Sequence, residues 1–253
     1  TFRYRLNEGG YLTPGFRHLF VVEAAGGAAP RQITKGDFHH VDGDGDLAWT
    51  PDGKGFVASG LVRADADLKG RDADLFLFPV DGGEPKRLTD FDGAEAQPAV
   101  SPDGRWIAWS GARDAQAFYV KPDLWVMPMA GGPARNLTAA LDRPVEQPEW
   151  SADGRRVLGL MNDAGLTRVI EVPASGGASR TLVPEVGGTR LYLPSSGGQW
   201  SAANGTLAYT SRFEDRPAGL EIRRGGRVVA SVDFNADWRA GKSIGQMERV
   251  TYK

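Results

Sequence analysis

One short stretch matches a known arrangement for a catalytic serine. Residues 241–245, Gly-Lys-Ser-Ile-Gly, match G-x-S-x-G, which exposes a serine nucleophile on a sharp turn between a strand and a helix. That chemistry needs a strand before the serine and a histidine after it. Residues 234–240 are a poor strand, and His40 is the last histidine of the chain. We therefore interpret the stretch as a linker and predict no catalytic residue in this chain.

The same stretch comes close to a phosphate-binding loop. The pattern G-x-x-x-x-G-K-[ST] would end at Ser243 and would need glycine at position 236, which is alanine. The glycine-rich loop that cradles phosphates is therefore not predicted.

Carboxylates and imidazoles that could hold a metal gather near residue 40. Asp42, Asp44 and Asp46 are spaced like the start of a calcium loop, but the position that should supply the last bidentate glutamate is Gly53. His39 and His40 are adjacent, so on a strand they would point to opposite sides. With no cysteine in the chain, thiolate sites are also excluded. We predict no metal and no cofactor.

Four charged residues are candidates for contact with a substrate. Glu95 and Glu146 precede similar sequences, "AQP" and "QP", and Arg113 and Arg143 lie in nearby polar stretches. Carboxylates and guanidinium groups can hold the charged ends of a peptide. Whether these side chains meet depends on the elements that carry them.

Those elements repeat along the chain. Similar sequences occupy 47–60, 97–110, 147–160 and 198–211. The aspartate of the turn recurs at 52, 103 and 153, and glycine pairs at 82–83, 131–132, 176–177 and 225–226, so the period is about 50 residues. Each repeat contains four short β-prone stretches joined by Asp-Gly and Gly-Gly turns, which is typical of an antiparallel meander.

Such sheets must stack face to face to bury their apolar residues, and stacking around an axis gives a β-propeller. Two packed sandwiches would not explain the repeat. We therefore expect an all-β propeller of four-stranded antiparallel blades, with about four complete blades and part of a fifth. The predicted propeller spans 1–235, with a partial blade at 1–34 and complete blades at about 38–89, 93–138, 145–183 and 189–233.

In each repeat the tight Asp-Gly and Gly-Gly turns join strand one to two and strand three to four, so they fall at one end of the sheet, and the longer connections fall at the other end. These connections are varied in sequence, and residues 62–74 and 111–123 are examples. Variable loops on a rigid scaffold commonly carry function. We therefore expect Glu95, Glu146, Arg113 and Arg143 near the mouth of a central channel as substrate-binding residues. The recurring Trp49, Trp150 and Trp200 are expected in the core between blades.

Composition narrows the partners. A net charge of −2 over 253 residues gives no electrostatic reason to expect nucleic acid or an anionic membrane surface. No apolar run approaches the ~18 residues that span a bilayer. The sequence does not distinguish between the bacterial cytoplasm and the periplasm as the compartment. It also does not distinguish a monomer from a homo-oligomer.

The repeat resembles a known family. The pattern "QP.WSPDGR.IA..S", followed by "DL.V.P..GG..R.LT", resembles the propeller of the prolyl oligopeptidase (S9) family of serine peptidases, and also TolB-like, WD40-like propellers. Residues 10–34 and the C-terminal "GQMERVTYK" (245–253) are similar to the acylaminoacyl-peptidase and dipeptidyl-peptidase branch.

The resemblance implies a propeller domain that is not itself catalytic. It would cap the active site of a C-terminal α/β-hydrolase domain and admit only short peptides. Residues 236–253 would be the linker and first strand leading to that domain, and the catalytic triad would lie outside residues 1–253. The expected partners are a peptide substrate and the chain's own hydrolase domain. Dipeptidyl peptidases also carry a glutamate pair for the substrate amine, which has no convincing match here.

Two alternatives remain from the sequence. The first is a TolB-like propeller that binds protein partners in the periplasm and catalyses nothing. The second is a sugar-binding or polyanion-binding propeller, although the loops lack a repeated set of ligand residues.

Overall fold

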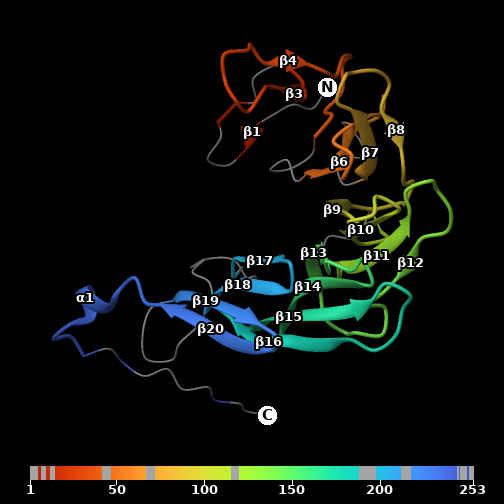
Figure 1. The fold of residues 1–253 in the computed structure, drawn as a ribbon. Helices are drawn as coiled ribbons and strands as arrows, with labels where there is room; N and C mark the ends of the chain where they lie inside the picture. The colour runs from red at the N-terminus through yellow and green to blue at the C-terminus, as the bar shows by residue number, and fades with distance from the viewer. Residues whose placement is uncertain are drawn as a thin grey trace. The chain divides into compact units, whose positions relative to one another are not determined.

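The computed structural model describes residues 5–6, 10–11, 15–41, 47–66, 72–114, 120–187, 198–211, 218–243, 245 and 250. These residues form β-strands and one short helix, α1 (Ala236–Arg239) (Figure 1). Contacts divide the chain into two compact units, one of residues 1–139 with 146–148, the other of residues 140–145 with 149–253. None of the described residues forms a helix that is long and apolar enough to cross a membrane.

The first unit contains a short hairpin and three blades. The hairpin is β1 (Arg5–Leu6) with β2 (Gly10–Tyr11), and blade 1 is β3 (Phe20–Val21) with β4 (Arg31–Gln32). Blade 2 has four strands, β5 (Leu47–Trp49), β6 (Gly55–Gly60), β7 (Asp74–Pro79) and β8 (Lys86–Arg87). Blade 3 follows the same order with β9 (Glu95–Val100), β10 (Trp106–Gly111), β11 (Asp123–Pro128) and β12 (Arg135–Asn136).

Two further blades follow. Blade 4 consists of β13 (Val145–Trp150), which crosses the boundary between the units, β14 (Arg156–Asp163), β15 (Leu166–Pro173) and β16 (Arg180–Val186). Blade 5 consists of β17 (Trp200–Ala203), β18 (Thr206–Ser211), β19 (Gly219–Arg224) and β20 (Arg227–Val232). All pairings within the sheets are antiparallel, as in the predicted meander.

Two details differ from the expected blades. Arg5–Leu6 pairs with Gly10–Tyr11 instead of adding a strand to blade 1. Blades 4 and 5 form one continuous sheet, because β16 runs on to Val186 and pairs there with Ser211 of β18. The last residues of β16, up to Val186, make the junction.

The Asp-Gly turns repeat the same hydrogen bonds. In blade 3, the Ser101 hydroxyl donates to the Asp103 carboxylate over 2.6 Å, and this carboxylate accepts the Arg105 backbone N–H over 3.0 Å. Gly104 has a φ of 70°, which costs glycine little. The corresponding turns at 50–54 and 151–155 have the same two bonds. One local sequence therefore builds three equivalent corners.

The strand order puts these corners at one end of each blade. Gly55, which follows the Asp-Gly turn of blade 2, pairs with Pro79, which precedes the Gly-Gly turn. Across the blades of the first unit, a Cβ on Gly104 would lie 3.5 Å from Pro51 of the preceding blade's turn. Blades 2 and 3 therefore present their Asp-Gly turns side by side, and the connections between second and third strands leave from the opposite end.

The apolar core lies between consecutive blades. Blades 1 and 2 share a cluster around Ile33, Phe56 and Phe78. Blades 2 and 3 share a cluster that joins Val57 and Leu75 to four residues of blade 3, namely Ile107, Trp109, Trp125 and Met127. In the second unit, Tyr209 of blade 5 packs against Leu158, Leu160 and Val169 of blade 4. The stacking expected from the repeat is thus observed.

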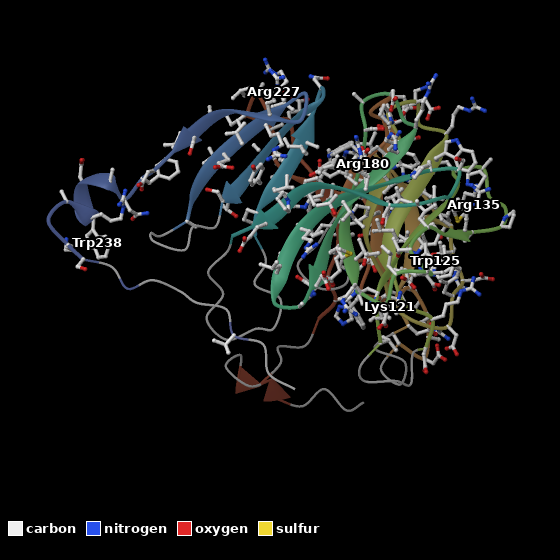
Figure 2. All side chains as sticks on the ribbon, turned by 90° about the horizontal axis from the view of Figure 1, so that it is seen from below. Lys121, Trp125, Arg135, Arg180, Arg227 and Trp238 are labelled. Atoms are coloured by element: carbon white, nitrogen blue, oxygen red, sulfur yellow. The ribbon has the colours of Figure 1, made fainter. Side chains whose placement is uncertain are left out.

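The tryptophans follow this pattern only in part. Trp109, Trp125 and Trp150 are buried. Trp49, expected in the core at the position equivalent to Trp150, is 51% exposed, and Trp238 of α1 is also exposed (Figure 2). Trp49 lies on β5, the strand at the edge of the sheet of blade 2. Trp150 lies on β13, which is also an edge strand of its sheet, so the place of the strand in the sheet does not explain the difference.

Candidate functional site

Glu95 begins β9 and is completely buried. The Thr89 hydroxyl donates a hydrogen bond to its Oε2 over 2.6 Å, and the same hydroxyl oxygen accepts the backbone N–H of Leu75 over 2.8 Å. The buried Ser59 hydroxyl of β6 donates to the Glu95 carbonyl over 2.5 Å. The other carboxylate oxygen of Glu95, Oε1, has no hydrogen-bond partner among the described residues. Glu95 thus joins blade 3 to blade 2.

Burial raises the pKa of Glu95 to about 8. The Thr89 hydrogen bond opposes this rise, while the carboxylates of Asp74 and Asp90 add to it. The Arg87 guanidinium also lowers the pKa, but burial outweighs both opposing effects, and a carboxyl taken out of water is more stable when protonated. At neutral pH this side chain is therefore mostly uncharged, and an uncharged acid is a weak ligand for a peptide amine.

When the first strands of blades 3 and 4 are aligned, Glu146 falls one residue after the position that corresponds to Glu95. The shared Gln-Pro pairs, Gln97–Pro98 and Gln147–Pro148, align β9 with β13, and both glutamines have positive φ, 54° and 53°. In that alignment Glu95 corresponds to the buried Val145, and Glu146 corresponds to the exposed Ala96. Successive residues of a strand face opposite sides, so the two glutamates occupy different environments. The similar places expected for them from the sequence are not equivalent.

Glu146 is partly buried, and burial raises the pKa of its carboxyl. Its neighbour Gln147 donates its backbone N–H to Oε1 of Gln97 over 2.8 Å. This side-chain bond joins the two left-handed positions of β9 and β13 and holds the start of β13 in place. Glu146 therefore projects from a fixed segment of backbone.

Arg113 is exposed on the connection between β10 and β11. Its guanidinium lies 4.0 Å from the centre of the Phe91 ring and 4.9 Å from the centre of the Trp125 ring. Those rings pack edge to face with their centres 4.8 Å apart. Trp125 is labelled in Figure 2 among the side chains of blade 3. Cation–π contact thus fixes this guanidinium at the surface.

Arg143 lies in the second unit and is held by acids. Its Nε donates to Asp163 over 2.7 Å, and its Nη1 lies 3.4 Å from the Asp142 carboxylate. Asp163 ends β14 at a two-residue turn, Ala164–Gly165. Because Arg143 is partly neutralised by these acids, its charge is less available to a ligand than that of Arg113.

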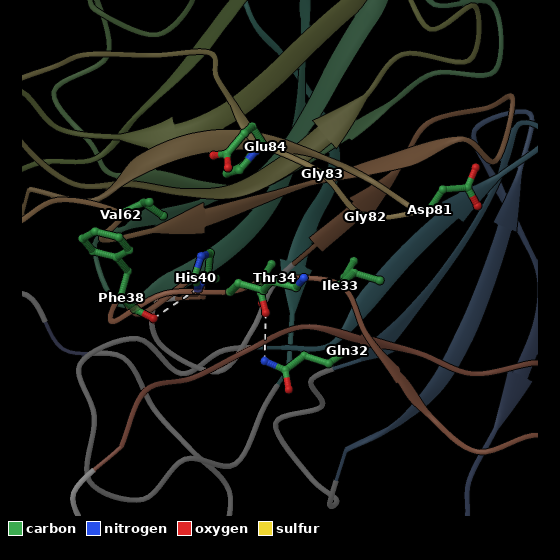
Figure 3. A pocket seen from close by; sticks show the side chains of 12 residues that line it. Gln32, Ile33, Thr34, Phe38, His40, Val62, Asp81, Gly82, Gly83 and Glu84 are labelled. Atoms are coloured by element: carbon green, nitrogen blue, oxygen red, sulfur yellow. Dashed lines mark hydrogen bonds between the residues drawn. The ribbon is translucent and has the colours of Figure 1, made fainter.

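A cavity of about 370 Å³ lies between blades 1 and 2, away from these four residues. Thr34, Phe38 and His40 line one side, and the segment Asp81–Glu84 lines the other (Figure 3). His40 is buried, and its Nδ1 lies 3.1 Å from the Phe38 carbonyl oxygen. The centres of the His40 and His18 rings are 5.2 Å apart, and the rings are tilted by 31°. Burial and the neighbouring His18 lower the pKa of His40, so the imidazole is neutral at pH 7.

Of the two chemical motifs of the sequence, the structure describes only the surroundings of Ser243. Helix α1 ends at Arg239, so a helix rather than a strand precedes Ser243, and the serine-nucleophile geometry is not formed. The aspartates at 42–46 lie outside the described residues. Within the described ranges, no three histidine or acidic side chains gather where they could hold a metal ion.

Comparison with known proteins places these features in a wider group. No family model matches the chain. Over 112 residues, 43% of the chain, it is 35% identical to tricorn protease homolog 1 of Streptomyces coelicolor, of which this segment is 10%. It is 26% identical over 207 residues to an uncharacterized protein of Agrobacterium fabrum, covering 77% of the chain and 62% of that protein. A 175-residue match to dipeptidyl-peptidase 5 of Porphyromonas gingivalis is 25% identical and covers 65% of the chain and 25% of that peptidase.

Solved structures agree on the architecture. A protein of Agrobacterium tumefaciens assigned as a TolB superposes with a TM-score of 0.62 at 17% identity, covering 85% of this chain and 74% of the other. A puromycin-hydrolyzing peptidase of Mycobacterium tuberculosis also superposes with a TM-score of 0.62 at 19% identity, covering 84% of this chain and 34% of the peptidase. The fold is that of a β-propeller. Homologues and structural neighbours of this propeller thus include peptidases as well as TolB-like proteins.

The propeller spans only part of its curated relatives, from a tenth to 62% of their lengths. Of the residues expected to bind substrate, the structure places Arg113 and Glu95 at the same end of blade 3, because Gly111 pairs with Glu95. Sequence analysis missed the aromatic support of Arg113. The signal was two aromatic residues, Phe91 just before the first strand of the blade and Trp125 within its third strand, although only the fold shows that their rings meet.

Proposed function

We propose that this chain is the non-catalytic propeller domain of a serine peptidase and that it caps the active site and filters peptide substrates. The observation that carries the proposal is the shared fold with a much longer peptidase. The propeller aligns over 84% of its own length with only 34% of the Mycobacterium tuberculosis enzyme. A peptidase domain would occupy the remaining length of such a protein.

The filtering role draws on the difference between the two ends of the blades. One end carries tight corners with repeated hydrogen bonds, and the other carries the longer connections of blades 2 and 3. Loops on a rigid scaffold can select ligands without moving the scaffold. A covered active site would also exclude folded proteins by size.

The charged residues take different parts in this proposal. Glu146, Arg113 and Arg143 reach the surface at least in part, so each can contact a peptide. Glu95 was a candidate for the same role, and its burial and protonation favour a position behind the surface, where it joins two blades. We propose that Glu146 is the residue that binds the amino group of the substrate, and Glu95 serves as the buried acid with which it is compared.

A hydrolysis assay tests the proposal. The purified chain and the full-length polypeptide that contains it are incubated with acetyl-aminoacyl and dipeptidyl p-nitroanilides. We expect turnover by the full-length polypeptide alone. Turnover by the purified chain, lost in Ser243→Ala, would overturn the non-catalytic role. A full-length polypeptide without hydrolase activity or hydrolase domain would overturn the peptidase assignment.

The second candidate function is that of a TolB-like propeller that binds proteins in the periplasm and has no enzymatic activity. It is favoured by the superposition on the Agrobacterium tumefaciens structure, in which the chain covers 74% of a protein not much longer than itself. The two candidates separate in the same assay, because this one predicts no hydrolysis by either protein. Its positive test is stable capture of a periplasmic protein by the purified chain.

A further inference from the structure

Among the described residues, Arg113 differs from Arg63, at the same end of the blades, in forming no ion pair with an acid. Arg63, on the equivalent connection of blade 2, is hydrogen-bonded to Asp65 and to Asp72. No carboxylate lies within ion-pair distance of Arg113 in the part of the chain that the structure describes. Its guanidinium contacts the rings of Phe91 and Trp125, and a cation–π contact does not use the N–H groups as hydrogen-bond donors.

The aromatic support of Arg113 is itself rigid. Phe91 packs against both Trp125 and Trp109, with ring centres 4.8 and 5.7 Å apart. Trp109 is completely buried, and the indole N–H of Trp125 donates to the Gly111 carbonyl over 3.1 Å. The rings therefore cannot turn away from the guanidinium without opening the core between blades 2 and 3.

The backbone that carries Arg113 is fixed as well. The N–H of Ala112 donates to the Ala94 carbonyl over 3.1 Å. Opposite it, Gly93 donates its N–H to Asp72 over 3.1 Å, and a Cβ on Gly93 would lie 2.0 Å from the Ala112 carbonyl oxygen. Only glycine fits at residue 93. The close contact between the segments of Gly93 and Ala112 therefore fixes the backbone next to Arg113.

From this geometry we infer that Arg113, supported by Phe91 and Trp125, is a binding site for a peptide carboxylate. A guanidinium presents a planar fork of donors that matches a carboxylate in a bidentate manner. Stacking on the rings fixes the fork in advance and lowers the conformational entropy lost on binding. The inference rests on the proposed function for its ligand class, since a peptidase propeller meets peptides. The carboxylate comes from the C-terminus of the peptide or from an acidic side chain.

The test is a titration of the purified chain followed by NMR at the Arg113 Nε–H and the Trp125 indole N–H. Three acetylated tetra-alanine probes separate the sources of the carboxylate. The first has a free C-terminal acid, the second a C-terminal amide, and the third the amide with one alanine replaced by glutamate. We expect the free acid, the glutamate peptide or both to bind about three- to tenfold more tightly than the plain amide, as suits a partly exposed charge-assisted hydrogen bond.

Variants separate the role of the guanidinium from that of charge in general. Arg113→Gln should reduce the affinity for the carboxylate probe to that for the amide. Arg113→Lys should recover only part of the difference, because the ammonium lacks the planar fork. Arg105→Gln is the matched control, since it removes an exposed arginine of the same blade from the opposite end of the sheet. It should leave the difference unchanged.

Equal affinity for all three probes, or the same loss in Arg105→Gln as in Arg113→Gln, would overturn the carboxylate site while leaving the peptidase proposal intact. Absence of binding by any probe at millimolar concentration would also overturn it. The peptidase proposal fails separately, in the hydrolysis assay. If Arg113→Gln lowers stability, unchanged Trp125 chemical shifts in the free variant establish that the rings keep their packing.

Discussion

Blades 3 and 4 share a backbone and differ in their chemistry. Both begin with a strand bent at a left-handed glutamine, and both turn through the same serine–aspartate corner. Blade 3 buries an acid at the first position of its first strand, where blade 4 has Val145. Blade 3 then connects its second and third strands through a longer segment, whereas blade 4 uses the two residues Ala164–Gly165.

The comparison teaches that the repeat fixes the backbone and leaves single positions free for other uses. A shift of one residue moves an acid from the covered side of the strand, as in Glu95, to the open side, as in Glu146. The corner residues, by contrast, keep their types because their side chains form the turn. The same backbone can therefore hold a completely buried acid in one blade and a partly exposed acid in the next.

The largest expected effect comes from placing the acid of blade 3 in blade 4. Val145→Glu would bury a carboxyl at a position that blade 4 fills with an apolar side chain. Glu95 accepts a hydrogen bond from Thr89, which follows the last strand of blade 2. The equivalent residue after the last strand of blade 3 is Thr138, and its hydroxyl already donates to Asp123. We expect a loss of about 3–5 kcal/mol in the free energy of unfolding at pH 7, measured in urea, since the buried group would lack a partner.

Val145→Ala is the control, because it removes volume without adding a charge and should cost about 2 kcal/mol. If Val145→Glu is no worse than the alanine variant, the two strand positions are not different in the way that their burial indicates.

The second effect is the pH dependence that Glu95 gives to stability. Its pKa is about 8 in the folded chain against 4.5 for the unperturbed group, so the folded state keeps a proton that the unfolded state releases. The contribution to stability is therefore complete below pH 4.5 and declines as the pH rises towards 8. Over this window wild type should lose about 4 kcal/mol relative to Glu95→Gln.

The measurement is the unfolding free energy of both proteins in urea at half-unit steps from pH 4.5 to 9. A constant difference between wild type and Glu95→Gln over that range would mean that Glu95 does not change its protonation on folding.

A third, smaller effect should be the same in both blades. Ser101→Ala and Ser151→Ala each remove a hydroxyl that accepts a backbone N–H of the next strand, over 2.9 and 3.0 Å. We expect a loss of about 1 kcal/mol from each, read from thermal or urea unfolding. A cost confined to one of the two would show that the corners are not energetically equivalent.

The smallest effect distinguishes blade 4. Ala164 has a φ of 49°, which is unfavourable for a residue with a Cβ, and it begins a two-residue hairpin turn that suits asparagine or glycine. Ala164→Gly should raise the unfolding free energy by about 0.5–1 kcal/mol. Ala174→Gly is the control, because the backbone at Ala174 does not have a positive φ, and it should lower the unfolding free energy slightly. An equal gain from both substitutions would contradict backbone strain at Ala164.

The sequence predicted the blades well because their signals are local. Asp103–Gly104 and its equivalents determine corners through bonds between near neighbours, and period-2 apolar stretches determine the strands. The exposure of Trp49 and the pairing of Val186 with Ser211 depend on contacts between segments that are distant in the sequence. The repeated pattern does not predict such contacts.

The candidate site was predicted less well for a related reason. Glu95 and Glu146 were expected at similar places because both closely precede a Gln-Pro pair, but their distances to that pair differ by one residue, and one residue reverses the face of a strand. Arg113 was identified as a charge on a loop. Its support by Phe91 and Trp125 joins residues from two other segments, and only the folded blade brings them together.

The central claim is that the propeller filters peptides for a peptidase, and its most direct test is the size dependence of hydrolysis. One cleavable sequence is presented to the full-length polypeptide twice, as a free peptide of about eight residues and as an exposed loop of a folded host domain. The account predicts a high kcat/KM for the free peptide and little or no cleavage of the folded host. Comparable kcat/KM values for the two substrates would contradict it.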